Sequence, residues 1–247
     1  MITDAHLHLL ELSQINNEWL DFINENDYRA IVSCHSIKDV EFAEKFSDKM
    51  FVSFGVHPQD PDQSKLKILE KLILEERIDA IGEIGFDRYA AEFRSKFEKQ
   101  VEVFEFQLDI AVKNNFPVIL HIRKAFEETF NYSRLLSKVP AVIFHSFSGT
   151  FEQADFFLKR DVNAFFSFGS SILNGHKKAL KTLDKLPVER ILAETDAPYQ
   201  PISGKEFSTL EDILNVIEKA GYVKGIDKSQ MKKVISSNFQ KILTKTP

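Results

Sequence analysis

The stretch Ile2-Thr3-Asp4-Ala5-His6-Leu7-His8 places two histidines at the end of a short apolar run near the beginning of the chain. In a β-strand, residues two apart share a face, so His6 and His8 project together, with Asp4 one step deeper. Two neighbouring imidazoles on one face are able to chelate one metal ion. This stretch therefore predicts a strand that ends in a ligand pair.

Seven further apolar or β-branched runs follow, separated by amphipathic stretches, which is the pattern of βα units in a parallel sheet. Eight such units favour a closed (β/α)8 TIM barrel of the α/β class, and we expect a single domain over residues 1–247. The predicted strands are Ile2 to His6, Ala30 to Ser33, Phe51 to Gly55, Ala80 to Glu83, Val118 to His121, Ala141 to His145, Ala164 to Phe168 and Ile191 to Asp196.

The intervening stretches carry helical periodicity, most clearly where Phe97, Val101, Phe104, Leu108 and Ala111 form one apolar stripe. We expect such stripes to cover the wall of the barrel. A helix that binds a partner or a membrane is the alternative for residues 97–111.

Histidine or a carboxylate also stands at or near the ends of other predicted strands, at Glu83, His121, His145 and Asp196. In a (β/α)8 barrel the carboxyl ends of the strands meet at one mouth, where the chemistry is placed. Together with His6 and His8 these side chains supply enough ligands for two metal ions, and His57 is a looser further member. The pattern indicates a metal-dependent hydrolase. Imidazole with carboxylate suits Zn²⁺ or Mn²⁺, and Mg²⁺ if enough oxygen ligands are present.

Composition and charge argue against several other classes of protein. The chain has 247 residues, 43% of them hydrophobic and 28% charged, and carries a formal net charge of -5. The single cysteine, Cys34, permits no intrachain disulfide, and neither a leader nor a long apolar run is visible, so we expect a cytoplasmic protein with no membrane partner. The acidic balance argues against a broadly basic surface for nucleic acid, so any phosphate must be held locally. No protein partner is implied.

An ordered set of motifs resembles the TatD family of metal-dependent deoxyribonucleases, within the amidohydrolase-like barrels, along nearly the whole chain. The motifs are Asp4-Ala5-His6-Leu7-His8-Leu9, Gly55-Val56-His57-Pro58, Gly82-Glu83-Ile84-Gly85-Phe86-Asp87, Phe104-Glu105-Phe106-Gln107-Leu108, Pro117-Val118-Ile119-Leu120-His121-Ile122-Arg123, His145-Ser146-Phe147-Ser148-Gly149, Glu194-Thr195-Asp196-Ala197-Pro198-Tyr199 and Asn238-Phe239.

The resemblance implies two divalent ions, with His6, His8 and Asp196 on one, His121 and His145 on the other, and Glu83 bridging them. It further implies that Asp196 orients or deprotonates the attacking water, which makes Asp196 and Glu83 the predicted catalytic residues. His57 and Arg123 resemble positions that contact the substrate phosphate, and arginine suits a bidentate grip on phosphate.

Two places depart from the family pattern, and two histidines are left without a role. Gln59 stands where a second histidine is common, and residues 200–206 only loosely resemble the usual loop after the last strand. Since both lie in predicted loops that would shape the substrate groove, polarity and strand preference stay open. We interpret His35 as structural and place His176 in an exposed loop.

The resemblance implies a phosphodiesterase acting on single-stranded ends of DNA, as a 3'–5' exodeoxyribonuclease. The alternative on the same metal centre is hydrolysis of another bond, namely a D-aminoacyl-tRNA ester or a small amide or phosphoester. A noncatalytic binding barrel is the third reading, and it would be expected to have lost ligands that this chain retains.

Overall fold

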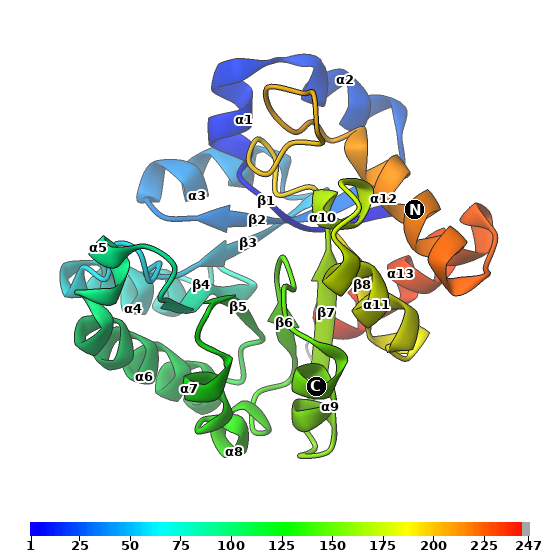
Figure 1. Ribbon diagram of the computed structural model, residues 1–247. Coiled ribbons are helices and arrows are strands. Elements are labelled where there is room, and N and C mark those ends of the chain that lie inside the picture. The colour runs from blue at the N-terminus through cyan, green and yellow to red at the C-terminus, as the bar shows by residue number, and fades with distance from the viewer. Residues whose placement is uncertain (244–247) are drawn as a thin grey trace.

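Eight parallel strands form one sheet in the order of the chain, from β1 to β8 (Figure 1). The computed structural model describes residues 1–243, so the last four residues of the predicted domain 1–247 lie outside the described part. The strands are β1 Ile2–Leu7, β2 Tyr28–Cys34, β3 Met50–Phe54, β4 Ala80–Asp87, β5 Val118–Arg123, β6 Val142–Phe144, β7 Ala164–Phe168 and β8 Ile191–Ala193.

The sheet closes on itself where the last strand meets the first. Asp196 donates its backbone N–H to the His6 carbonyl at 2.9 Å, and His8 donates to the Ala197 carbonyl at 2.7 Å. These two bonds join the segment after β8 to the carboxyl end of β1. The predicted (β/α)8 barrel is therefore confirmed, and its seam lies beside the histidine pair.

Strand boundaries differ from the predicted ones at four functional positions, one of which is His121, because β5 continues to Arg123. β4 continues to Asp87, past the predicted end at Glu83, whereas β6 ends at Phe144 and β8 at Ala193. His145 and Asp196 thus lie in the loops after their strands, and both have a positive-φ residue at or beside them, since φ is +44° at Ser146 and +55° at Asp196. The turn out of each strand, rather than the strand itself, aims these two side chains.

Helices surround the sheet on its outer face (Figure 1). They are α1 Leu9–Ile15, α2 Glu18–Glu25, α3 Ile37–Ala43, α4 Leu66–Leu74, α5 Ala91–Arg94, α6 Phe97–Asn114, α7 Phe126–Phe130, α8 Ser133–Leu136, α9 Phe151–Leu158, α10 Ser170–Leu173, α11 Lys177–Lys185, α12 Asp212–Lys224 and α13 Lys228–Leu243, with short 3-10 turns η1 Glu44–Phe46, η2 Gln63–Lys65 and η3 Val188–Arg190. Within residues 1–243, no helix is both long and apolar enough to span a bilayer.

The stripe predicted on residues 97–111 packs inward along α6, where Phe104, Leu108 and Ala111 are buried. The alternative of a partner or membrane helix is therefore wrong for this segment. The same face also buries two amides: Gln107 accepts the Val56 N–H at 2.7 Å and Gln100 accepts the Asp87 N–H at 2.9 Å. α6 thus holds the backbone of the His57 loop and the end of β4.

Two apolar layers hold the barrel together. The larger lies between strands and helices and includes stacked phenylalanines such as Phe144 and Phe166, whose ring centroids are 5.3 Å apart. The smaller fills the barrel interior with residues including Ile31, Ile119 and Phe165, and Phe239 of α13 belongs to it. This packing fills the barrel interior, so polar chemistry is confined to its rim.

Candidate metal centre

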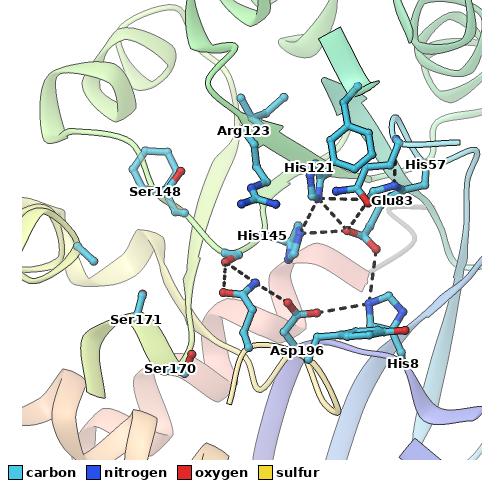
Figure 2. Close-up of a pocket in the computed structure, with 18 of the residues that line it drawn as sticks. His8, His57, Glu83, His121, Arg123, His145, Ser148, Ser170, Ser171 and Asp196 are labelled. Carbon is cyan, nitrogen blue, oxygen red and sulfur yellow. Dashed lines mark hydrogen bonds and ion pairs between the residues drawn. The ribbon is translucent and has the colours of Figure 1, made fainter. Parts of the chain in front are cut away.

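The six predicted ligands come together at the carboxyl ends of the strands, and Figure 2 labels all of them except His6. They are His6, His8, Glu83, His121, His145 and Asp196, and none is more than 9% exposed. β1, β4 and β5 supply or border four of them, and the loops after β6 and β8 supply the other two. Closure of the barrel thus brings together residues that are far apart in the sequence.

The first donor cluster lies at the barrel seam. His6 Nε2 and His8 Nε2 are 3.3 Å apart, and Asp196 Oδ1 lies 3.6 and 3.4 Å from them. Glu83 Oε2 completes the group at 3.4 Å from His6 and 3.7 Å from His8. Two imidazoles and two carboxylate oxygens therefore face one point.

The second donor cluster uses the other oxygen of Glu83. Glu83 Oε1 lies 3.0 Å from His145 Nε2 and 3.4 Å from His121 Nδ1, and those two nitrogens are 3.3 Å apart. His57 Nε2 lies 3.3 Å from His121 Nδ1 and 3.7 Å from Glu83 Oε1. We predicted that His57 contacts the phosphate, and these distances also place it close enough to the second cluster to act as a metal ligand.

The donor chemistry fits divalent cations. Four donors bound to one Zn²⁺ at about 2.0–2.1 Å lie about 3.3 Å apart in a tetrahedron, close to the spacings of both clusters. Burial and the neighbouring His145 lower the pKa of His6, which keeps its imidazole neutral as coordination requires. Burial opposes ionisation of Glu83, but the histidines around it, which include the charged His145 and the hydrogen-bonded His121, outweigh burial and bring its pKa well below the ordinary range. Glu83 is therefore ionised, and it lies between the histidines of the first cluster and those of the second.

Two further carboxylates, Asp87 and Asp4, support the predicted ligands, a role that the sequence alone does not predict. Asp87 accepts from His121 Nε2 at 3.1 Å, and so fixes which nitrogen of that ring faces Glu83. Asp4 accepts the His6 N–H and the Thr195 hydroxyl, at 3.1 and 2.7 Å, and ties β1 to the segment after β8. The sequence did contain a signal for this role, because Asp4 and Asp87 lie in the same motifs as the predicted ligands His6 and Glu83.

Gly85 allows β4 and β5 to approach each other beside His121. Its φ is +138°, and a Cβ at this position would lie 2.3 Å from the His121 carbonyl oxygen. A larger residue would therefore push β5 away and displace the imidazole.

Gln200 and Glu194 hold the loops after β8 and β6. Gln200 Nε2 donates to Asp196 Oδ2 at 2.5 Å and contacts the Ser146 hydroxyl at 2.8 Å. Glu194 Oε1 accepts the Ser146 N–H at 2.7 Å and lies 3.6 Å from His145 Nδ1. One network thus spans the two loops that carry His145 and Asp196.

His35 lies in the site, contrary to the structural role assigned from sequence. Its Nε2 is 3.4 Å from Glu83 Oε2, and its ring centroid is 5.4 Å from that of His8. The signal was present, because His35 directly follows β2 at the same edge of the sheet as the ligands. His176 is exposed, as expected, and stands on the rim of the cavity that opens onto the site.

An open cavity of about 1010 Å³ gives access to both donor clusters. Arg123 lines it on one side and Ser148, Ser170 and Ser171 on another (Figure 2). The Arg123 guanidinium stands 4.3 Å from the ring centroid of Tyr89, and its Nη1 lies 3.8 Å from Asp87 Oδ2. Because the side chain is half exposed to the cavity, its other donors can meet a ligand. A cavity of this size accommodates a nucleotide-sized ligand.

Three further polar side chains near the site are engaged by protein groups. Lys124 contacts the ring of Tyr89, at 4.7 Å from its centroid. Arg88 pairs with Glu128, which occupies its guanidinium. Gln59, where a histidine is common in the family, donates to Asp87 at 2.8 Å and so supports the carboxylate behind His121. This departure from the family pattern therefore serves the second donor cluster.

Comparison with known proteins agrees with this geometry. The family model of the TatD-related DNases matches residues 3–244. An uncharacterized metal-dependent hydrolase of Mycoplasma genitalium, MG009, is 32% identical over 97% of each chain, and the 3'-5' ssDNA/RNA exonuclease TatD of Edwardsiella piscicida is 28% identical over 84% of this chain and 83% of its own.

Solved structures share the same barrel. The TatD homologue YjjV of Escherichia coli superposes with a TM-score of 0.83 at 20% identity, covering 98% of this chain and 97% of its own. A TatD family hydrolase of Entamoeba histolytica gives 0.81 at 20% identity, covering 99% and 98%. The family match along nearly the whole length and the shared architecture lead to one conclusion: this chain belongs to the TatD-related DNase family.

Proposed function

We propose that this protein is a metal-dependent phosphodiesterase that trims single-stranded DNA from its 3' end, with two divalent ions, Zn²⁺, Mn²⁺ or Mg²⁺, as cofactors. The observation that carries the proposal is the placement of Glu83, whose two oxygens face separate donor clusters at the base of one open cavity. The exonuclease name of the Edwardsiella relative supports the choice of substrate.

Each predicted residue has a place in this proposal. His6, His8 and Asp196 would hold one ion, His121 and His145 the other, and Glu83 would bridge them. Two such cations, when bound, lower the pKa of water and stabilise charge on the attacking and leaving oxygens of a phosphoryl group.

Asp196 is the proposed proton acceptor. Burial disfavours its charged form, but the hydrogen bond from His8 and the charge of His145 keep its pKa below the ordinary value. The carboxylate is therefore ionised at neutral pH. Asp196 Oδ1 would serve as the ligand, while Oδ2, held by Gln200, would take the proton from water.

His57 and Arg123 are the proposed contacts to the phosphate. Burial lowers the pKa of His57 well below its ordinary value, so this imidazole is neutral and offers one N–H or one lone pair. Arg123 supplies a permanent cation with two parallel donors. A phosphate held by Arg123 would lie in the same cavity as Glu83 and the two donor clusters.

Release of nucleotides from a labelled single-stranded 12-mer tests the proposal. We expect cleavage only with divalent metal, and a decrease of at least 100-fold in rate for Glu83→Gln and for Asp196→Asn, the scale of a missing general base. Glu98→Gln, on the exposed face of α6, is the matched control and should cleave normally.

Elemental analysis supplies a readout that does not depend on activity. Two ions per chain are expected in the purified protein, and His8→Ala should reduce that content. Normal cleavage by both carboxylate variants with folding intact would refute the mechanism. Turnover of D-aminoacyl-tRNA or small esters, without cleavage of DNA, would instead favour another bond on the same centre.

A further inference from the structure

Helix α11 carries a lysine-rich face that the proposed mechanism does not use. Its sequence, KKALKTLDK, places exposed lysines at positions 177, 178, 181 and 185. Positions i, i+1, i+4 and i+8 share one side of a helix. With one aspartate the helix has a net charge of +3, in a chain whose net charge is -5.

This face adjoins the metal centre. Lys178 lines the cavity that holds Glu83 and Asp196. It also lines a neighbouring hollow of about 250 Å³, together with Lys177, Lys181, Lys185 and the first residues of α9. The two hollows therefore share a wall, and a ligand leaving the metal centre past Lys178 would pass directly onto the lysine face.

Most of these charges have no protein partner. Lys185 lies 3.6 Å from Glu152, but among the described residues no carboxylate lies within 4.0 Å of Lys177, Lys178 or Lys181. A purely solvated face of a globular protein usually mixes the two signs of charge. Three unpaired cations beside the active cavity therefore favour an anionic ligand.

The placement of these lysines is unfavourable for the helix itself. Lys177 and Lys178 occupy the first turn of α11, where the helix dipole disfavours cations. Lys177 and Lys181 are like charges four residues apart, which also destabilises a helix. Helix stability thus gives no reason for the pattern, whereas repeated contacts to a polyanion would.

We propose that Lys177, Lys178 and Lys181 form a track that binds the phosphate backbone of a single-stranded nucleic acid whose end lies at the metal centre. The proposal rests on the proposed function and deepens it, since it names the surface that would hold the strand beyond its reacting end. A single strand fits better than a duplex, because the donors are buried at the base of the cavity and an unpaired end is narrower than a duplex. Cationic grooves that follow the backbone are the usual means of binding single strands.

The double variant Lys178→Glu/Lys181→Glu tests the track. Binding is measured by fluorescence anisotropy of the metal-loaded protein with a single-stranded 12-mer protected by terminal phosphorothioates. We expect about tenfold weaker binding, and a plot of log affinity against log salt that is shallower by about 0.7 for each phosphate that the variant no longer neutralises. In steady-state cleavage, the ratio of KM for a 12-mer to KM for a dinucleotide should rise about tenfold in parallel.

The matched control is Lys113→Glu/Lys138→Glu, which changes the net charge equally. Lys113 lies in the last turn of α6 and Lys138 precedes β6, so both lie at the opposite end of the barrel from the metal centre, and both are exposed. This variant should bind the 12-mer like the unaltered protein. Equal weakening by both pairs, or no weakening by the α11 pair, would overturn the track.

Different results would contradict the proposed function and the lysine track. Lysine-dependent binding of the 12-mer without cleavage of any phosphodiester would contradict the proposed function and support the track. Cleavage of dinucleotides and 12-mers with equal KM, unaffected by the α11 variant, would support the function and contradict the track.

Discussion

Gln200 shows how one residue outside the ligand set governs the proposed base. Its amide holds Asp196 Oδ2 at 2.5 Å and is braced by Ser146. The carboxylate would otherwise rotate about its Cβ–Cγ bond, because the other oxygen is constrained only by the histidine pair. Gln200 is therefore a positioning residue that acts through Asp196.

Gln200→Ala should lower kcat by about 10- to 100-fold, the usual effect of removing a partner behind a ligand, with a smaller change in KM. Metal content should stay near that of the unaltered protein, which distinguishes impaired orientation from an impaired metal site. Gln240→Ala, on the exposed side of α13, is the control. An unchanged kcat would show that the amide does not position the base.

At the scale of elements, Glu44 and Arg77 join two neighbouring units of the barrel wall. Arg77, in the segment before β4, places its Nε and Nη2 2.7 and 2.9 Å from the two oxygens of Glu44 in η1. The hydrogen bond from Arg77 lowers the pKa of Glu44. Both side chains are about one third exposed, so solvent screens the pair.

Glu44→Gln should lower the free energy of unfolding by about 0.5–1 kcal/mol at pH 7, after allowance for screening. Because the folded pKa is depressed, the contribution is fully present above the unfolded value near 4.3 and is lost as pH falls through the folded pKa. Urea titrations at pH 7 and below pH 4 check this, with Glu98→Gln as the control. A difference from the unaltered protein that grows with acid would contradict the assignment.

For the whole molecule, the donor clusters join strands that are distant in the chain. His6 and His8 stand at the end of β1, Glu83 in β4, His121 in β5, and Asp196 beyond β8. These buried donors converge only in the folded barrel, so ions held by them would stabilise the native state by mass action.

Chelation should therefore lower Tm. At a metal concentration 100 times Kd the stabilisation is about 2.7 kcal/mol per ion. Each kcal/mol corresponds to about 2–4 °C in a chain of this size, so EDTA should shift Tm by roughly 5–10 °C per ion removed. Calorimetry with and without EDTA measures the shift, and His8→Ala should show a smaller one. An unchanged Tm in protein shown to contain metal would contradict the argument.

The sequence by itself determined the eight strands, their helical covers and the residues proposed as ligands, since strand and helix periods and strand-end positions are local patterns. Only the tertiary structure decided which oxygen of Glu83 meets which histidines, how Asp87 orients His121, and that His35 and the α11 lysines border the same cavity. These relations depend on barrel closure, strand register and the turns after β6 and β8. Such contacts join residues far apart in the chain, and no local pattern encodes them.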